Sequence, residues 1–337
     1  MNTPYAVRMS RYGPPDVLSY QPVELRPLSP CEVRIRTRVA AVNHTDLHIR
    51  AGDWPVRKDN PFPYTPGVEV TGELVELGHA VTGWAVGDRV ITLMQGLGGV
   101  RADRPGGYAD YVTADASTLA RVPGGVDDFE IAALGLGAVT AFGGLKRLGN
   151  LKGRRVLVTG AAGGVGSAAI GLARAQGAEV LALVSRSEQT DYVQELGVAE
   201  VIVSPREGTP ALAAESVDAV LDTVGGRLFP RLVTALRPGG ALSLVGAVQG
   251  GDVDFDAWQL LKPVIITGYS TEALDGAGLC EAVTAIGDAL ATGRFHIPRY
   301  RIFPMSRASE AHRLLEARGV EGRVLLVPDY LQREGSA

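Results

Sequence analysis

The chain has 337 residues, of which 46% are hydrophobic and 21% charged, a composition typical of folded globular proteins rather than disordered ones. Because a single hydrophobic core stops growing at about 250–300 residues, this length favours two domains. The formal net charge of −4 and the absence of any run of four Lys or Arg residues disfavour a nucleic-acid partner.

Neither a signal peptide nor a membrane span is predicted. The first ten residues lack an apolar core, and no uninterrupted apolar stretch approaches the roughly 20 residues that cross a bilayer. We therefore expect a cytoplasmic protein without a membrane partner. The only cysteines, Cys31 and Cys280, lie far apart in the sequence, which favours ordinary thiols over a disulfide framework or a cysteine metal site.

Two kinds of segment follow one another along the chain. Short alternating apolar stretches broken by glycine and proline, typical of an all-β domain, occupy residues 33–40, 70–78, 88–93 and 108–112. From about residue 128, helix-compatible stretches rich in Ala, Leu and Gly alternate with wholly apolar strands. These strands are expected at residues 155–159, 179–184, 200–203, 218–222, 241–245 and 264–268. Fully apolar strands separated by helices predict a doubly wound parallel sheet covered on both faces.

The segment after residue 268 is too short to form a domain alone. It contains an expected helix at 280–292, a second helix near 309–318 and a closing strand at 323–328. We predict that this segment returns to complete the N-terminal β domain. Residues 1–127 and 269–337 then form one domain, and residues 128–268 form a continuous α/β insert.

A glycine-rich turn joins the strand at 155–159 to an alanine-rich helix. This order of elements brings a pyrophosphate against backbone N–H groups at the helix N-terminus, where the helix dipole favours negative charge. Gly163 and Gly166 match the second and third glycines of the dinucleotide-binding fingerprint, whereas Ala161 replaces the first. The residues predicted to bind the cofactor here are Gly160, Ala162, Gly163, Gly164, Val165 and Gly166.

The end of the next strand indicates which cofactor is bound. At the place where an acidic side chain would pair with a ribose 2′-hydroxyl, the chain has Ser185, Arg186 and Ser187. Hydroxyl groups and a guanidinium accommodate a 2′-phosphate. We therefore predict NADPH (NADP) as the cofactor, bound by Ser185 and Arg186. The alternative is that Arg186 is a solvated turn residue.

Further motifs accompany the glycine turn. They read A-V-N-H-T-D-L-H-I-R-A-G-D-W-P at 41–55, G-V-E-V-T-G-E-L-V-E-L-G at 67–78, G-G-Y-A-D-Y-V at 106–112, V-L-D-T-V-G at 220–225 and L-R-P-G-G at 236–240. Together they resemble the medium-chain dehydrogenase/reductases, and among these the zinc-independent quinone oxidoreductase and enoyl reductase branch. The resemblance implies an α/β protein with a GroES-like β catalytic domain made from both chain ends, a Rossmann domain between them, and an active-site cleft at their junction.

Two positions depart from the zinc alcohol dehydrogenases of this superfamily. The resemblance places Asn43 and Val68 where those enzymes have a Cys and a His that bind zinc, while Glu69 is retained. One carboxylate cannot hold a tetrahedral ion that needs three protein ligands. Residues 94–104 contain no Cys for the structural zinc. We therefore predict no metal, and we expect Glu69 in a buried ion pair for which Arg89 is the candidate partner.

The resemblance places residues 43–48 beneath the nicotinamide ring. Thr45 and His48 match the hydroxyl–imidazole proton relay of zinc alcohol dehydrogenases, and His48 stands where quinone and enoyl reductases often have a Tyr proposed as proton donor. An imidazole with a pKa of about 6.5 donates and recovers a proton near neutral pH. We predict His48, Thr45 and Asn43 as the catalytic residues. The alternative for His48 is a hydrogen bond to a cofactor ribose, or packing against the cleft wall.

Other residues are expected to line the cleft. The amide of Asn43 can hydrogen-bond the nicotinamide carboxamide or the substrate oxygen. The resemblance brings His44 toward the pyrophosphate, with an exposed loop histidine as the equal alternative, and it brings Thr140 near the nicotinamide. The last candidates, at the strand ends where doubly wound sheets bind ligands, are Val245, Gly246 and Ala247.

Three functions remain open. Without a zinc ion to stabilise an alkoxide, acceptors whose charge delocalises after hydride addition are favoured. The leading hypothesis is therefore an NADPH-dependent reductase of a quinone or an α,β-unsaturated carbonyl. The second is a metal-free alcohol or ketone dehydrogenase that uses the Thr45–His48 relay, and the third is a nucleotide-binding module without activity. The apolar strand at 264–268 would leave an unpaired sheet edge, so we also expect a homodimer.

Overall fold

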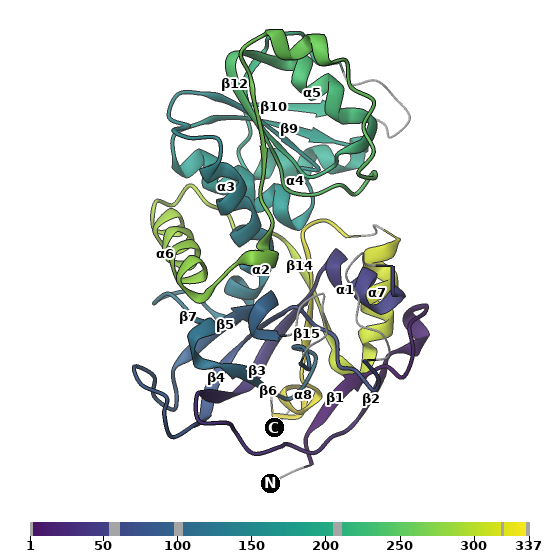
Figure 1. Cartoon of the computed structure of the whole chain (residues 1–337), viewed down its shortest axis with the longest axis vertical. Coiled ribbons are helices and arrows are strands. Elements are labelled where there is room, and N and C mark those ends of the chain that lie inside the picture. The colour runs from purple at the N-terminus through teal and green to yellow at the C-terminus, as the bar shows by residue number, and fades with distance from the viewer. Residues whose placement is uncertain (1–2, 54–60, 98–103, 205–210, 318–319, 335–337) are drawn as a thin grey trace. The chain divides into compact units, whose positions relative to one another are not determined.

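The computed structural model describes residues 3–53, 61–97, 104–204, 211–317 and 320–334 (Figure 1). The chain divides into two compact units. Unit 1 comprises Met1–Leu136, Glu272–Val283 and Arg299–Ala337, and unit 2 comprises Gly137–Thr271 and Thr284–Pro298. Both units are therefore assembled from segments that are distant in the sequence.

A seven-stranded sheet forms the centre of unit 1. Its strands are β3 (Glu32–Val42), β4 (Glu69–Leu77), β5 (Arg89–Leu93), β6 (Tyr111–Asp115), β7 (Leu119–Arg121), β14 (Tyr300–Pro304) and β15 (Arg323–Val327). They pair in the order β14-β15-β3-β4-β5-β7, with β6 also paired to β3, and only β14 and β15 run parallel. Because the C-terminal strand β15 adds to β3, residues 323–327 belong to the same sheet as the N-terminal strands.

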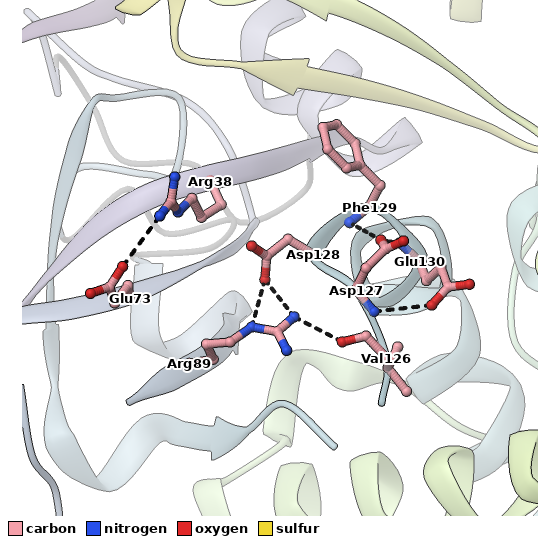
Figure 2. A network of polar contacts seen from close by, with 8 residues as sticks. All are labelled: Arg38, Glu73, Arg89, Val126, Asp127, Asp128, Phe129 and Glu130. Atoms are coloured by element: carbon pink, nitrogen blue, oxygen red, sulfur yellow. Dashed lines mark hydrogen bonds and ion pairs between the residues drawn. The ribbon is translucent and has the colours of Figure 1, made fainter. Parts of the chain in front are cut away.

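Alternating side chains fix β3 in the middle of this sheet. Val33, Ile35 and Val39 are buried. Arg36 and Arg38 both contact the Glu73 carboxylate of β4, at 3.1 and 3.4 Å, and Figure 2 shows the second of these ion pairs. The last residues of β3 are all buried, so the strand carries the chain from the sheet surface into the core immediately before residues 43–48.

A hairpin and three α-helices complete the described part of unit 1, together with the first halves of two further helices. They are β1 (Tyr5–Arg8), β2 (Ser19–Pro22), α1 (His44–Ala51), α7 (Ala308–Glu316) and α8 (Asp329–Glu334). One apolar cluster joins α1, α7 and the strands through Leu47, Ala311, Leu315, Val7 and Leu326. Helix α1 is therefore packed into the core of unit 1 along one face.

Unit 2 is built on six parallel strands in the order β10-β9-β8-β11-β12-β13. The strands are β8 (Arg155–Thr159), β9 (Glu179–Val184), β10 (Glu200–Val203), β11 (Val217–Asp222), β12 (Leu236–Leu244) and β13 (Ile265–Gly268). All six predicted apolar strands are present, which confirms the doubly wound parallel sheet. The strand order reverses between β8 and β11, the point at which such sheets bind ligands.

Helices connect the parallel strands of unit 2. They are α3 (Gly164–Ala175), α4 (Thr190–Glu195) and α5 (Phe229–Ala235). Leu157, Leu181, Val220 and Leu242 of the sheet are buried in one cluster with Leu232 of α5. Helix α6 (Gly276–Ala291) contributes residues to both units, so the domain limits predicted at residues 127 and 268 are not the limits of these compact units.

Helix α2 (Asp128–Lys146) is broken at Gly135, whose φ and ψ are 29° and −130°. The Asp127 side chain accepts hydrogen bonds from the N–H groups of Phe129 and Glu130, and the Glu130 carboxylate accepts one from Asp127 N–H (Figure 2). This reciprocal arrangement satisfies backbone donors of the first helical turn. Figure 2 also shows Arg89 of β5 bonded to Asp128, which ties the start of α2 to the sheet.

Helix α2 is also the one helix in the described residues that is long and apolar enough to cross a membrane, by length and composition alone. The sequence analysis did not identify it. In the structure, 78% of its most apolar window is buried inside the protein, which is the pattern of a core helix.

Gly135 leads to a prediction about stability. A β-carbon at this position would overlap the Glu69 carboxylate, and a φ of 29° is a backbone conformation that other residues rarely adopt. We expect Gly135→Ala to lower the free energy of unfolding by roughly 2–4 kcal/mol, measured by urea titration. Gly124→Ala, with open space around its β-carbon, is the control and should change it by less than about 0.5 kcal/mol. Equal losses in the two variants would contradict the overlap.

Candidate active site

The glycine-rich turn forms a site for an anion at the start of α3. A β-carbon on Gly166 would collide with the Gly160 carbonyl oxygen and would lie 2.7 Å from Ala161 Cα, so only glycine allows the helix to approach the strand this closely. Gly163 is the N-cap residue and provides no side chain to cap the first turn. The N–H groups of Gly164 and its successors therefore point out of the helix end, where a pyrophosphate fits.

The other predicted residues of unit 2 gather around the same strand ends. Val245 N–H donates to the Asp222 carbonyl at 2.8 Å, which sets the loop after β12 against the loop after β11. A β-carbon on Gly144 of α2 would lie 2.5 Å from a methyl carbon of Val245, and one on Gly137 would lie 2.8 Å from the Gly164 carbonyl oxygen. Thr140 lies on α2 between these two glycines. Helix α2 therefore packs against both Gly164 and Val245, and Thr140 lies on the part of the helix between these two contacts.

A polar pair missed by the sequence analysis holds β8 and β11 together at the switch point. The buried Thr159 hydroxyl donates to Asp222 Oδ1 at 2.6 Å, and the Asp222 carboxylate accepts hydrogen bonds from the N–H groups of Val224 and Gly225. Burial raises the pKa of Asp222. An acidic residue at the end of an apolar strand was the signal that would have identified it.

Ser185 and Arg186 directly follow β9, and both are exposed. The adjacent strand β10 ends beside them, because Ser204 N–H donates to the Val184 carbonyl at 2.8 Å. Ser185 Oγ lies 3.5 Å from Gln189 Oε1 in the turn that follows. A hydroxyl and a guanidinium are therefore present at the sheet edge where a cofactor ribose is expected in this type of domain.

In unit 1, Asn43 is the N-cap residue of α1 and Asp46 occupies its first turn. The fully buried Asp46 carboxylate accepts hydrogen bonds from Asn43 N–H at 2.9 Å and from Val68 N–H at 3.0 Å. Burial raises the pKa of Asp46 to about 7. Asp46 therefore joins the start of α1 to the segment that leads into β4, and it acts as a structural acceptor.

A buried ion pair lies beside this N-cap. Arg323 of β15 donates to Glu69 Oε2 of β4 at 2.8 Å and to Asn43 Oδ1 at 2.9 Å. The Asn43 amide donates to Glu69 Oε2 at 3.1 Å and to the Ala41 carbonyl at 3.3 Å. The expectation that Glu69 pairs with Arg89 is wrong, because Arg89 is bonded to Asp128 and Arg323 occupies the partner position.

These bonds define what Asn43 offers to a ligand. Both amide hydrogens are used inside the protein, and the amide oxygen accepts one bond from Arg323. The Asn43 amide is therefore bonded within unit 1, and the predicted contact with a nicotinamide carboxamide stays a prediction.

The two histidines of α1 are exposed, and Thr45 is half-buried between them in the sequence. Desolvation, followed by the positive charges of His48 and Arg323, lowers the pKa of His44. His48 Nδ1 lies 2.9 Å from Asp53 Oδ1, just beyond the helix end. The predicted catalytic residues Asn43, Thr45 and His48 therefore belong to one helix start and its first two turns.

The opposite face of α1 is held by Arg50. Its buried guanidinium donates to the Gly13 carbonyl at 3.0 Å, lies 3.2 Å from His312 Nδ1 of α7 and pairs with Glu316. Burial and the charge of Arg50 lower the pKa of His312 to about 3. A neutral imidazole can therefore accept a hydrogen bond from the guanidinium. Sequence reasoning missed this cluster, because its members lie at opposite ends of the chain.

No group of three His, Cys, Asp or Glu side chains in the described residues could hold a metal ion. Asn43 and Val68, which the resemblance places where zinc alcohol dehydrogenases have metal ligands, are both buried. The retained acid, Glu69, is bonded to Arg323 and Asn43. Residues 98–103 lie outside the described part of the chain, and metal independence stays a prediction.

Comparison with known proteins agrees with this architecture. The family described as "Alcohol dehydrogenase GroES-like domain" matches residues 29–124, and that described as "Zinc-binding dehydrogenase" matches residues 164–271. A quinone oxidoreductase of Sus scrofa is 27% identical over 332 residues, which cover 96% of this chain and 97% of the relative. An NADPH-dependent alkenal/one oxidoreductase of Arabidopsis thaliana is 29% identical over 95% of this chain and 78% of its own length. A solved structure described as a mycobacterial protein complexed with NADPH superposes with a TM-score of 0.81, 28% identity and coverage of 96% of this chain and 100% of that one.

A glycine-rich turn at the switch point of a doubly wound sheet, together with a β domain made from both chain ends, defines an oxidoreductase of the dinucleotide-binding class. Within that class the chain belongs to the medium-chain dehydrogenase/reductase superfamily, as its two matched domains and its relatives show.

The buried ion pair gives a prediction that can be tested without substrate. Arg323→Met would leave the Glu69 carboxylate buried without its cation, so we expect the free energy of unfolding to fall by roughly 3–5 kcal/mol in urea titration. The double variant Glu69→Gln, Arg323→Met should recover at least half of this loss. The control is Arg307→Met, which removes an exposed ion pair with Glu310 and should leave the free energy of unfolding nearly unchanged. A double variant no more stable than Arg323→Met alone would show that the unpaired charge is not the cause.

Proposed function

We propose that the protein is an NADPH-dependent, zinc-independent reductase that delivers hydride to a quinone or an α,β-unsaturated carbonyl compound. One observation carries the proposal. Asn43, at the position of a zinc ligand, is bonded to the Glu69–Arg323 ion pair, while the same helix start retains the hydroxyl and imidazole of Thr45 and His48. Thr45 and His48 are therefore still available for proton transfer, although Asn43 replaces a metal ligand at the same helix start.

The proposed cofactor follows from unit 2. The start of α3 fits a pyrophosphate, and NADPH would supply the hydride. Arg186 and Ser185 at the end of β9 favour the 2′-phosphate of NADPH over the free hydroxyl of NADH. The Arabidopsis relative is named as NADPH-dependent and the mycobacterial structure is described as a complex with NADPH, which supports the same cofactor.

The proposed substrate class follows from the charge that develops during reduction. Addition of hydride to the β-carbon of an enone leaves an enolate, and addition to a quinone leaves a phenolate. Both anions delocalise their charge, so they need a proton donor more than a Lewis acid. The imidazolium of His48, directly or through the Thr45 hydroxyl, would supply that proton and recover it from water.

A second function shares the same residues. The Thr45–His48 pair also matches a proton relay for the oxidation of an alcohol, so a metal-free alcohol or ketone dehydrogenase is the alternative. NADPH oxidation with a panel of quinones, enones, enoyl thioesters and ketones separates the two. Turnover confined to ketones would favour the dehydrogenase, and no turnover with any class would favour a nucleotide-binding module.

We further propose that a second copy of the chain pairs with β13. This strand is the edge of the six-stranded sheet, and its Ile265 side chain is 59% exposed. Trp258 and Leu261, in the segment before it, are 76% and 75% exposed. An open strand edge flanked by large apolar side chains is a surface that proteins normally cover. The partners proposed are therefore a small electron-poor molecule and a second copy, without nucleic acid or membrane.

Cofactor choice is the first test. NADPH should bind more tightly than NADH in calorimetric titration, and Arg186→Ala should reduce that difference by roughly 1–3 kcal/mol, the usual contribution of a charge-assisted hydrogen bond. Arg231→Ala removes an exposed arginine of α5 from the same unit and should leave the difference unchanged. Equal dissociation constants for the two cofactors in the unmutated protein would exclude the proposed preference.

The role of His48 is the second test. We expect His48→Ala to lower kcat for an enone roughly 10²–10⁴-fold, the usual contribution of a general acid, and to leave NADPH affinity nearly intact. His48→Tyr should restore part of the rate, because a phenol can also donate a proton. An enone is needed, because reduced quinones collect protons from water. Weaker NADPH binding with unchanged turnover at saturation would identify His48 as a ribose contact instead.

The dimer is the third test. Light scattering at micromolar concentration should report two copies for the unmutated protein and a single copy for Ile265→Asp, which places a charge on the exposed edge strand. Val86→Asp is the matched control, because Val86 is an exposed apolar residue of unit 1 and lies outside β13. A monomer in the unmutated protein would rule out the proposed pairing.

A further inference from the structure

An aspartate faces the proposed proton donor across the end of α1. His48 Nδ1 lies 2.9 Å from Asp53 Oδ1, and both side chains are on the protein surface. Neither the cofactor turn nor the proposed relay uses this carboxylate. Its position relative to His48 therefore requires a separate explanation.

The backbone of the helix end places Asp53 at this distance. Gly52 ends α1 in the left-handed conformation with a φ of 81°, and its N–H donates to the His48 carbonyl at 2.9 Å. The N–H of Asp53 points at the same carbonyl at 3.3 Å. The chain therefore reverses direction at the end of α1. The N–H of Asp53 caps the His48 carbonyl, and the Asp53 carboxylate lies beside the His48 ring.

Packing holds this turn in place. A β-carbon on Gly52 would overlap the ring of Tyr12, so the turn is in close contact with an aromatic side chain. Tyr12 in turn packs edge to face on Phe62, with ring centroids 4.8 Å apart. Arg50 anchors the same helical turn through the Gly13 carbonyl and the Glu316 carboxylate. The distance between His48 and Asp53 is therefore set by the fold of unit 1.

We propose that Asp53 is a positioning residue for His48, whose carboxylate accepts the Nδ1 hydrogen and makes Nε2 the ring atom that delivers the proton. This rests on the proposed function. When the enolate takes the Nε2 proton, the neutral ring keeps its Nδ1 hydrogen on Asp53, and Nε2 recovers a proton from water. The carboxylate fixes the tautomer and the ring orientation through one turnover.

Among the described residues, Asp53 is the acidic group that faces the His48 ring. His44, one turn earlier, has a pKa lowered by desolvation. Arg50 is directed to Glu316 and His312 of α7, on the opposite face of α1.

The test reads the ring directly. The protein has five histidines, so ¹⁵N-histidine labelling with long-range proton–nitrogen correlation gives few signals, and His48→Ala assigns those of His48. We expect the unmutated protein to hold His48 as the Nδ1–H tautomer. Asp53→Ala should shift the neutral ring toward Nε2–H. Asp53→Asn keeps an acceptor without the charge, so it should retain the tautomer.

Kinetics with an enone give the second readout. Asp53→Ala should lower kcat several-fold, because the ring is no longer held with Nε2 as the proton-delivering atom, with the KM for NADPH unchanged. Asp53→Asn, which retains the tautomer, should keep more of the rate. Glu24→Gln, which removes one exposed charge elsewhere in unit 1, should leave both kcat and the NMR signals of His48 as they are.

An unchanged tautomer in Asp53→Ala would overturn the proposal, and so would a changed tautomer without a fall in kcat. The NMR readout needs neither substrate nor cofactor. If no substrate of the panel is reduced, the proposed function fails while the pairing of Asp53 with His48 is still decided.

Discussion

The ion pair between Arg323 and Glu69 is the constraint on which unit 1 depends. Its two members come from β15 and β4, the strands that flank β3, and both bond to Asn43 where β3 ends. A buried charge pair is costly to desolvate, and it persists only where geometry and further hydrogen bonds are good. Here Asn43 supplies those bonds, so the ion pair also fixes the residue from which α1 starts. The placement of Thr45 and His48 follows from it.

The two units solve different electrostatic problems by different means. In unit 1 the buried guanidinium of Arg323 compensates the buried carboxylate of Glu69, and Arg50 holds the core-facing side of α1. Unit 2 has no acidic residue in the first turn of α3, and its glycine turn leaves helix N–H groups open to an anion. The backbone N–H dipoles at the start of α3 are fixed and need no counter-ion, so they are suited to bind a dianionic pyrophosphate.

Much of the fold could be predicted because it is encoded locally. The parallel strands are continuous apolar runs, and the turn between β8 and α3 is read directly from its glycines. The partner of Glu69 could not be read in this way, since Arg323 is 254 residues away and any arginine of the unit satisfies the same rule of charge pairing. The break at Gly135 was also missed, because its cause is the Glu69 carboxylate of another segment. The roles of Asp53 and Asp222 were not predicted, because they depend on neighbouring groups that only the fold brings into hydrogen-bond distance.

The origin of Arg323 in one of the last strands has a consequence for biosynthesis. A ribosome releases Glu69 some 254 residues before its partner, and the strands of unit 2 emerge in between as one unbroken series. Domains generally fold as units during synthesis, N-terminal segments first. In this chain Glu69 cannot pair with Arg323 until all the strands of unit 2 have been synthesised. Vectorial synthesis therefore allows the parallel sheet of unit 2 to form native structure before β15 adds to the sheet of unit 1.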